Sequence, residues 1–562
     1  MANIRFFSLG GLGENGKNMY CVEVDKKIFI LDTGLKYPNS ELYGIDEIIP
    51  DFRMLTKVKQ HIKGIFLSHA HEDHVGALPH ILKELNVPVY GSEFTLEIVK
   101  EQLKENDYNL NDYKFVAIKD TSYIKFGDVK VTFFSTNHSI PGSLAIVIMT
   151  LDGSIVFTSD FTLMQSGNEM YQTNFRKINE IAEKGVLLLL PESVGAPMEF
   201  VSGLKEQLFH RLNNTISRAT GRIIVTLFSS DIQKIQNIID ISVANNKKIA
   251  VLGRRTQKIV DIAIKNGYLN IPSHLLISLK FIDDKNKNLD PNLVCLITGN
   301  RHEPFYMLQR MTRKVDRLIN IEQSDTIIML TPPIPGTEKM AARTLDLLFK
   351  TDAEVMIVDR KQLQASHASA EELKMMINFL NPKYIVPVTG EFRQQFACKK
   401  CALEIGYKDE NVFLLDNGDS LYIEEKVANI AKEDVKTGDI LIDGIPIADS
   451  NDVVMRDREL LADDGAVIVV ASIDPKKRVL LGKIEVSSKG FSNGIEAEET
   501  LKNDLTKLSL EIINKHLSAK KYINWNDIKK DLRDVINNYI YKSSRRNPII
   551  IPLMISAELS ND

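Results

Sequence analysis

The chain is poor in cysteine, and neither sign of charge is in large excess. Its 562 residues include four cysteines and carry a formal net charge of -4. Four scattered cysteines are too few for a disulfide framework, so we expect a reducing compartment. The small net charge excludes global basicity as the means of holding a polyanion, although a local basic groove would not show in that sum.

The chain also lacks long unbroken apolar runs. No window approaches the length of a transmembrane span, and the N-terminal MANIRFFSLGGLGENG is interrupted by glycines before it could form the core of a signal peptide. These features predict a cytoplasmic protein with no membrane partner. Cys398-Lys-Lys-Cys401 is a single C-x-x-C pair, and two thiols on one turn of a helix explain it better than metal or redox chemistry.

What the chain does contain is enough apolar sequence, 44% of its residues, for several cores. Residues 1–190 alternate β-rich runs with amphipathic stretches, and Asp152-Gly153 between two apolar runs predicts a hairpin. After Pro191, GRIIVTLFSSDIQKIQNIIDISVANNKKIAVLGR has the strand, helix, strand order of a parallel βαβ unit. The charged EEKVANIAKEDVKTGD predicts a linker, and the strands and amphipathic helices beyond it predict a small α+β domain.

The stretch LSHAHEDH holds three histidines and two carboxylates directly after an apolar run. A strand ending at Leu67 would present His69 and His71 on the same side. Asp73 and His74 follow on a tightening turn. Neutral imidazole and carboxylate suit zinc or manganese, and neighbouring side chains that point apart can reach two ions. The pattern predicts a metal site, and the alternative is a polar loop with chance histidines.

Two later loops strengthen the metal prediction. STNHSIPGS places His138 after a β-rich run, and VFTSDF places Asp160 at the end of another. Both positions are strand ends, where loops of a sheet gather. With the first cluster they would complete a two-metal arrangement, in which a bridging carboxylate and the ions activate a water and neutralise charge on an oxyanion.

The motif H-x-H-x-D-H, followed by the histidine of NHSIP and the aspartate of SDF, resembles the metallo-β-lactamase fold. Further motifs resemble, in order, signatures of the RNase J family within the β-CASP nucleases: GGLGENGKNMY, DTGLKYP, GIDEIIPDF, TGNRHEPFYMLQRM, PPIPGTE, SHASAEELK and PVTGEFR. VVMRDRELLADDGAVIVV then resembles that family's C-terminal domain. The resemblance covers nearly the whole chain.

The resemblance implies an α/β fold in which an αββα metallo-β-lactamase sandwich is interrupted by a β-CASP α/β domain and followed by a small α+β domain. Together with the changes in sequence texture, it sets the expected boundaries. They are 1–200 and 356–425 for the two parts of the metallo-β-lactamase domain, 201–355 for the β-CASP domain, 426–447 for the linker and 448–562 for the C-terminal α+β domain.

In that family, RNA lies between the two catalytic domains with its scissile phosphate over two metal ions. Carried over, the resemblance assigns His69, His71 and His138 to one ion. It assigns Asp73 and His74 to the other. For both ions zinc is the first expectation, and manganese or magnesium are the alternatives. Asp160 would bridge the two ions.

Two further residues take the places of β-CASP motifs. Glu192 in PESVGA matches the first acidic motif. His367 in SHASAEE matches a motif histidine that would contact the scissile phosphate or the leaving group. The alternative for both residues is an ordinary structural role in a loop or as a helix cap. The resemblance thus implies as catalytic residues Asp73, His74, Asp160, Glu192 and His367.

FSSDIQK and SHAS are similar in character to a pocket for the 5′ phosphate of RNA. Serines before a helix favour an anion, but Ser and Asp are also the commonest helix caps. The family commonly has Asn at Asp231 and Arg at Lys234, and a carboxylate beside a phosphate needs compensation, which two arginines in GRR could supply. The expected RNA and phosphate contacts are Ser229, Ser230, Lys234, Arg254, Arg255, Ser366, His367 and Ser369.

Two motifs depart from the family's pattern. In PVTGEFR, Thr389 stands where active members carry the histidine that completes the shell of the second ion. A threonine hydroxyl is a poor ligand at neutral pH, so we expect this ion to bind weakly. In TGNRHEP, Arg301 and His302 replace smaller, less basic residues. The pattern is similar to the weaker paralogue that some bacteria keep beside a fully active one.

Three functions compete at this point. The first is a metal-dependent ribonuclease, with 5′-to-3′ exonuclease and endonuclease action in RNA decay and maturation, at a rate reduced by Thr389. The second is a weakly active or inactive RNA-binding subunit that forms a complex with an active RNase J paralogue. The third, a small-ester metallohydrolase, has no use for a β-CASP insertion. Expected partners are RNA and either further copies of this chain, in a homodimer or higher oligomer, or that paralogue.

Overall fold

The computed structural model describes residues 1–38, 42, 44–164, 168–199, 204–278, 282, 289–333, 337–358, 366–444, 452–490, 495–519 and 523–557. The chain divides into two compact units. One comprises Met1–Tyr37 and Glu47–Ile440, and the other comprises Pro38–Asp46 and Leu441–Asp562.

The first unit contains an eight-stranded sheet with the order β20-β19-β1-β2-β3-β5-β6-β7. Its strands are β1 (Ile4–Gly10), β2 (Met19–Val24), β3 (Lys27–Leu31), β5 (Ile62–Phe66), β6 (Val89–Gly91), β7 (Phe115–Ala117), β19 (Ser420–Glu424) and β20 (Val427–Ala431). A six-stranded sheet has the order β18-β12-β11-β10-β9-β8. Its strands are β8 (Tyr123–Phe126), β9 (Val129–Ser135), β10 (Leu144–Thr150), β11 (Gly153–Ser159), β12 (Val186–Pro191) and β18 (Tyr384–Ile385).

These two sheets pack face to face around one apolar core. Phe6, Tyr20 and Phe66 from the larger sheet and Phe133 and Phe157 from the smaller sheet all belong to this core. Thr150 of β10 pairs with Gly153 of β11, so the hairpin predicted at Asp152-Gly153 is confirmed. Large aromatic side chains on both inner faces therefore form much of the contact between the two sheets.

Helices cover the outer faces of both sheets. α4 packs against β6 and β7 of the larger sheet. Apolar residues of α5, α13 and α14, among them Ile178, Leu373 and Cys398, pack against the outer face of the smaller sheet. The bounds of the helices are α1 (Arg53–Lys57), α2 (Glu72–Val75), α3 (Leu78–Leu85), α4 (Glu93–Glu105), α5 (Phe175–Ala182), α13 (Ala370–Leu380) and α14 (Phe392–Glu404). The four layers form the expected αββα sandwich.

A third sheet is inserted between two neighbouring strands of the smaller sheet. β12 and β18 pair in parallel, although the whole insertion separates them in the sequence. The inserted sheet has the order β14-β15-β13-β16-β17 and is parallel throughout. Its strands are β13 (Ile223–Phe228), β14 (Lys248–Leu252), β15 (Leu293–Gly299), β16 (Thr326–Met329) and β17 (Glu354–Ile357).

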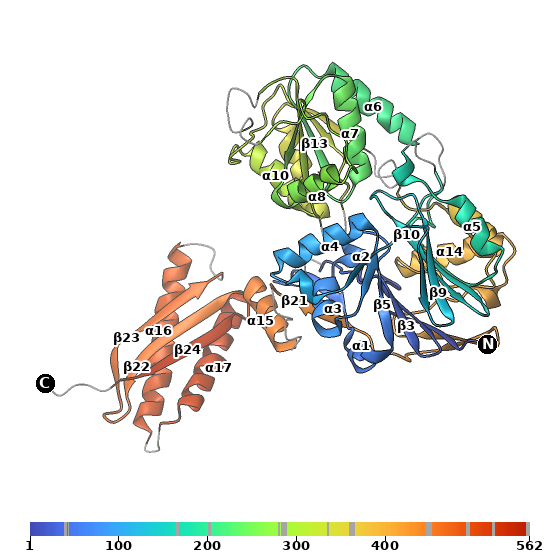
Figure 1. The fold of residues 1–562 in the computed structure, drawn as a ribbon. Coiled ribbons are helices and arrows are strands. Elements are labelled where there is room, and N and C mark those ends of the chain that lie inside the picture. Colours follow the sequence, from blue (N-terminus) through green and yellow to red (C-terminus); the bar gives the residue numbers. More distant parts are fainter. Residues whose placement is uncertain are drawn as a thin grey trace. The chain divides into compact units, whose positions relative to one another are not determined.

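The inserted sheet has helices on both faces, as Figure 1 shows around β13. α6 (Leu204–Arg218), α7 (Ile232–Ala244) and α8 (Arg254–Lys265) cover one face. α10 (Glu303–Thr312) and α11 (Glu338–Phe349) cover the other. A parallel sheet buried on both sides requires continuously apolar strands, which is the pattern of LVCLITG in β15. The βαβ unit predicted from the sequence is therefore confirmed as β13-α7-β14.

The second unit is a three-stranded sheet with helices. β22 (Ala466–Asp474) pairs antiparallel with β23 (Val479–Lys489) and parallel with β24 (Ile549–Ser556). α15 (Asp452–Asp463), α16 (Ile495–Ser518) and α17 (Trp525–Ser544) complete it. Val467, Val469 and Ile473 on alternate positions of β22 share a core with Ile528 and Leu532 of α17. The strands and helices that the apolar periodicities predicted here thus share one core, as expected for an α+β domain.

The expected linker is partly wrong. Within 426–447, β20 (Val427–Ala431) joins the eight-stranded sheet beside β19, and Asp439–Ile442 forms the further strand β21. β20 is an edge strand with mostly exposed side chains, and the charged residues on both sides of VANIA hid it in the sequence. The remaining domain boundaries stay predictions. No helix of the described residues is long and apolar enough to cross a membrane. Cys398 and Cys401 are unpaired thiols buried in α14.

A buried ion pair ties the start of β13 to the turn before β16. The guanidinium of Arg222 donates to both carboxylate oxygens of Asp325, with distances of 3.1 Å from Nε and 2.6 Å from Nη2. Nη2 also donates to the Asn320 carbonyl at 2.7 Å. Both charged side chains are only 1% exposed.

We expect Asp325→Ala to lower the free energy of unfolding by about 3–5 kcal/mol, because it leaves the guanidinium buried without its counter-charge. Urea unfolding followed by circular dichroism measures this change. Lys408→Ala is the matched control, since the Lys408–Glu410 pair is 78% and 75% exposed. A midpoint for Asp325→Ala no lower than that of the control would contradict the prediction.

Candidate metal centre

The first cluster of side chains gathers where strands of both sheets of the sandwich end. His69 and His71 follow β5, and His71 is the N-terminal cap residue of the short helix α2. His138 follows β9, and Asp160 follows β11. Because β5 belongs to the larger sheet and β9 and β11 to the smaller one, only the packing of the two sheets brings these residues together.

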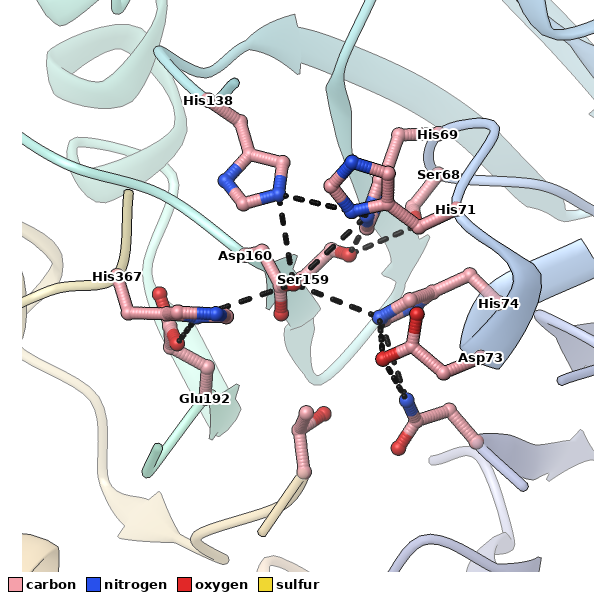
Figure 2. A network of polar contacts seen from close by, with 12 residues as sticks. Ser68, His69, His71, Asp73, His74, His138, Ser159, Asp160, Glu192 and His367 are labelled. Atoms are coloured by element: carbon pink, nitrogen blue, oxygen red, sulfur yellow. Dashed lines mark hydrogen bonds and ion pairs between the residues drawn. The ribbon is translucent and has the colours of Figure 1, made fainter. Parts of the chain in front are cut away.

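Three imidazoles point their ring nitrogens at one place. His71 Nδ1 lies 3.1 Å from His69 Nε2 and 3.2 Å from His138 Nε2. Together with an oxygen of Asp160, they are the one four-residue group of potential metal ligands found in the described part of the chain. Figure 2 shows the three rings and the carboxylate converging.

Asp160 lies at the centre of the cluster. Its Oδ2 is 3.7 Å from His69 Nε2, 3.5 Å from His74 Nε2 and 3.6 Å from His138 Nε2. Burial disfavours the ionised carboxylate, but the imidazoles of His74, His367 and His138 outweigh burial and hold the pKa of Asp160 well below its usual range. The carboxylate is therefore ionised and available as a metal ligand.

Outer hydrogen bonds orient the histidines. His138 Nδ1 lies 2.7 Å from the Ser366 carbonyl oxygen, which accepts its hydrogen. His69 Nδ1 lies 3.0 Å from Ser68 Oγ and 3.3 Å from Ser159 Oγ. A partner on one ring nitrogen fixes the tautomer and turns the other nitrogen toward a metal.

The donor set fits a divalent metal ion. Burial and neighbouring imidazoles hold the pKa values of His69 and His138 well below the usual range, so both rings are in the neutral form that binds metals. Asp160 Oδ1 is buried and has no hydrogen-bond partner in the described structure. A buried carboxylate oxygen without a donor is costly unless a cation satisfies it.

The residues expected at a second ion lie beside this group. His74 Nε2 is 3.5 Å from Asp73 Oδ2 and 3.5 Å from Asp160 Oδ2. His74 Nδ1 lies 2.7 Å from Asp32 Oδ2. Burial lowers the pKa of His74, but the carboxylates of Asp73, Asp160 and Asp32 outweigh burial and raise it well above the usual range. Three carboxylates around one imidazole attract a positive charge to this point, and a metal ion would supply it.

A close backbone approach holds this second group in place. Leu35 and Thr33 bond to the backbone of Glu72 and His74, and Gly34 lies against Asp73. A Cβ at Gly34 would lie 1.6 Å from the Asp73 carbonyl oxygen. The glycine of the DTG motif is therefore required for this contact.

Thr389 does not reach the histidine and aspartate ligands directly. Its Oγ1 lies 3.1 Å from Tyr20 Oη, and its backbone nitrogen donates to the same oxygen at 2.9 Å. Tyr20 Oη donates to Asn18 Oδ1 at 2.9 Å, and Asn18 Nδ2 lies 3.2 Å from His74 Nε2. Thr389 is thus linked to the second group through two further side chains.

On the other side of Asp160, the buried Glu192 pairs with the half-buried His367. His367 Nδ1 lies 2.7 Å from Glu192 Oε2 and 3.8 Å from Asp160 Oδ2. Glu192 Oε1 accepts hydrogen bonds from the backbone nitrogens of Phe161 and Ala368. Burial opposes protonation of His367, but the carboxylates of Glu192 and Asp160 raise its pKa to about 9.

The expected phosphate contacts are partly engaged elsewhere. Ser229 Oγ donates to Asn300 Oδ1, and Asn300 Nδ2 donates to Glu72 Oε1 at 2.5 Å. These bonds link the inserted domain to the segment that carries the expected ligands. Ser230 is half-buried in the turn before α7. Asp231 caps α7 by accepting from the backbone nitrogen of Lys234 at 3.0 Å, and it also pairs with the Lys234 ammonium.

The cap and the ion pair favour helix capping over phosphate binding as the role of this loop. The same holds for Ser369, whose Oγ accepts from Glu372 in the capping box of α13. Ser366 contributes its carbonyl oxygen to His138 and lies beside His367. The side chains of Arg254 and Arg255 lie outside the described residues.

The motifs did not reveal the partners that hold the ligands. Asp32 accepts from the Ser68 backbone nitrogen and from Ser68 Oγ and also contacts His74. Ser159 Oγ donates to Ser68 Oγ at 2.7 Å. Asp32 follows β3 directly, at a strand end of the same sheet as β5, and that position was the available signal.

An αββα sandwich with a cluster of histidines and an aspartate at its strand ends defines a metallo-hydrolase of the metallo-β-lactamase superfamily. The metallo-β-lactamase superfamily model matches residues 12–172, and the Zn-dependent metallo-hydrolase RNA specificity domain matches 364–414. The models of the ribonuclease J β-CASP domain and the ribonuclease J C-terminal domain match residues 220–348 and 453–557.

The chain belongs to the ribonuclease J family. It is 38% identical to Ribonuclease J 2 of Staphylococcus epidermidis and 37% identical to Ribonuclease J 2 of Staphylococcus aureus, in each case over 98% of both chains. These matches support a hydrolytic ribonuclease, as the motifs predicted. A crystal structure of a protein of unknown function from Enterococcus faecalis, with a TM-score of 0.52 and 16% identity, covers 75% of this chain and 100% of its own length. That likeness shows the fold alone.

Removing one imidazole should remove metal from the first group. We expect His138→Ala to weaken binding of the tightest zinc or manganese ion by more than about 100-fold, since even the loss of an outer partner of a ligand costs 10–100-fold. Equilibrium dialysis with elemental analysis measures the affinity. His80→Ala, a histidine of α3 outside the cluster, is the control. Equal metal content in the two variants would contradict the assignment.

Proposed function

We propose that the chain is a metal-dependent ribonuclease that hydrolyses RNA phosphodiester bonds with two divalent ions, as a 5′-to-3′ exonuclease and as an endonuclease. The observation that carries this proposal is the convergence of His69, His71, His138 and Asp160 within ligand distance of one another, in a chain of the ribonuclease J family. RNA decay and maturation in the cytoplasm are the processes that this activity would serve.

The proposal assigns one ion to the three histidines and the second ion to Asp73 and His74, with Asp160 shared between them. When bound, divalent ions act as Lewis acids toward a phosphate oxygen and make a nearby water more acidic. The chain's own part is to hold the ligand atoms in place. Asp32 orients His74 through Nδ1, and the Ser366 carbonyl orients His138.

Glu192 and His367 would act on the substrate. Because Nδ1 of His367 bonds to Glu192, the ring is held in one orientation and its other nitrogen is left to donate to a phosphate oxygen or to the leaving group. Hydrogen bonds from the backbone nitrogens of Phe161 and Ala368 keep the Glu192 carboxylate fixed. The pair therefore acts as a positioned donor next to Asp160.

The expected rate is reduced because Thr389 supplies no imidazole. Its hydroxyl is engaged with Tyr20 at 3.1 Å. The same observation favours a second candidate function, a weakly active or inactive RNA-binding subunit that works in a complex with an active paralogue. Co-purification with a family member that carries histidine at this position, together with no RNA cleavage by this chain alone, would favour the subunit.

The nuclease proposal predicts metal-dependent cleavage of RNA. Purified protein with manganese and a 5′-monophosphorylated RNA should release mononucleotides and shorter fragments, resolved on a denaturing gel. Asp160→Ala should lower the rate by at least about 1,000-fold, because it removes the ligand shared by both groups. Product from the natural protein that Asp160→Ala makes equally fast would come from a contaminant and would contradict the proposal.

Restoring an imidazole at position 389 should raise the rate. We expect Thr389→His to increase manganese-dependent cleavage by at least about tenfold, the size of effect that a single metal contact commonly has. The backbone should accept the change, since Thr389 has φ of 53° and histidine is commoner than threonine in that region.

Thr389→Asn controls for the backbone, because asparagine also tolerates this conformation but brings no imidazole. The same gain in both variants would show that the backbone, and not a new ligand, sets the rate. Unfolding temperatures of the metal-free proteins are measured as a control, to test whether the variants are equally stable.

A further inference from the structure

The side chain of Asn18 ends among the atoms assigned to the second ion. It is fully buried, and its amide nitrogen lies 3.2 Å from His74 Nε2 and 3.4 Å from Asp73 Oδ2. His74 Nε2 itself is 3.5 Å from Asp73 Oδ2 and 3.5 Å from Asp160 Oδ2. Two atoms that bind one ion at 2.0–2.2 Å are separated by roughly 3.0–3.6 Å, so the Asn18 amide has the spacing of a fellow ligand.

The backbone fixes this position. The Asn18 nitrogen donates to the Asp73 carbonyl at 3.2 Å, and the Gly34 nitrogen donates to the Asn18 carbonyl at 2.9 Å. The segment that carries Asn18 is therefore bonded directly to the segment that carries Asp73. The amide reaches the second group because of this pairing and needs no movement of the main chain.

Rotation of the amide by 180° would place Oδ1 where Nδ2 now lies. The two ends of the amide are nearly equal in size, so this exchange needs no extra room. Asn18 Nδ2 would then donate to Tyr20 Oη, which is 2.9 Å from the present position of Oδ1. The Tyr20 hydroxyl keeps two other acceptors within reach, the Gly11 carbonyl at 3.2 Å and Thr389 Oγ1 at 3.1 Å. The Tyr20 hydroxyl therefore keeps a partner after the exchange.

We propose that Asn18 binds the second metal ion through Oδ1 and takes the coordination position that Thr389 does not fill. The ligands of that ion are Asp73, His74, Asp160 and Asn18. Thr389 contributes indirectly, as an acceptor for the Tyr20 hydroxyl when the amide turns. A set with three oxygens and one imidazole suits manganese or magnesium better than zinc, so the second site prefers a harder ion than the three-histidine site. This inference rests on the proposed function.

The test measures manganese binding and does not depend on activity. Protein stripped with a chelator is dialysed against graded manganese, and bound metal is counted by elemental analysis. We expect two ions per chain in the natural protein. Asn18→Ala should weaken the second ion by at least about tenfold and leave the first unchanged. Asn18→Asp should tighten the second ion, because it replaces a neutral oxygen with a charged one in the same place.

Asn417→Ala is the matched control, since Asn417 also donates to a backbone carbonyl and a carboxylate, those of Leu12 and Glu14, and its hydrogen bonds in the described structure do not involve an expected ligand. Unchanged binding of the second ion in both Asn18 variants would overturn the proposal. So would tighter binding in Asn18→Ala, which would mean that the amide blocks the site. If Asn18→Ala does not fold, Asn18→Asp alone decides by the direction of its shift.

A double variant separates a ligand from a structural residue. In the Thr389→His background the added imidazole fills the position, so Asn18→Ala should then cost much less affinity for the second ion than it does alone. Equal costs in the two backgrounds would show that Asn18 only supports the loop and would overturn the proposal. Failure of the proposed function is distinguishable from failure of this inference. In that case the natural protein itself binds no ion and cleaves no RNA, whatever residue stands at position 18.

Discussion

The attraction between the Asp160 carboxylate and the imidazoles around it is the interaction on which the site depends. One oxygen of Asp160 lies within 3.5–3.8 Å of four histidines that come from three separate segments of the chain. Burial makes an unpaired carboxylate costly there, so the fold must supply positive charge or a cation. The apolar sandwich serves this requirement, because its two sheets bring the strand ends together and exclude water from the carboxylate.

The arrangement of partners behind the ligands explains why the cluster suits metals. His69, His74 and His138 each have a hydroxyl, carboxylate or carbonyl on the nitrogen that faces away from Asp160. These contacts fix the tautomers and hold the rings in position before any ion binds. The inserted domain contributes as well, since Asn300 of that domain bonds to Glu72 beside the ligands. The inserted domain, which is expected to form one side of the RNA channel, is therefore connected to the loop that carries the expected metal ligands.

In the proposed function, Thr389 is the residue that distinguishes this chain from fully active members of the RNase J family. Its hydroxyl and its backbone nitrogen both bond to Tyr20, and Tyr20 bonds to Asn18. The position of the missing imidazole is thus connected by hydrogen bonds to the second group of ligands. A change at 389 would therefore alter a network as well as a single expected ligand, and both proposed functions, a slow nuclease and a subunit of a complex, depend on this position.

The sequence by itself determined the fold class, the hairpin at Asp152-Gly153, the βαβ unit and the family, because apolar periodicity and motif spacing are local properties of the chain. It also indicated His69, His71, His138 and Asp160 as neighbours, since each follows a strand. Only the tertiary structure decided that Asp32 and Asn18 lie beside His74, that Asp231 caps α7 and pairs with Lys234, and that β20 is an edge strand of the sandwich. No spacing in the sequence encodes the contacts between separate segments, and the choice between a helix cap and a phosphate contact at Asp231 depends on its side-chain conformation.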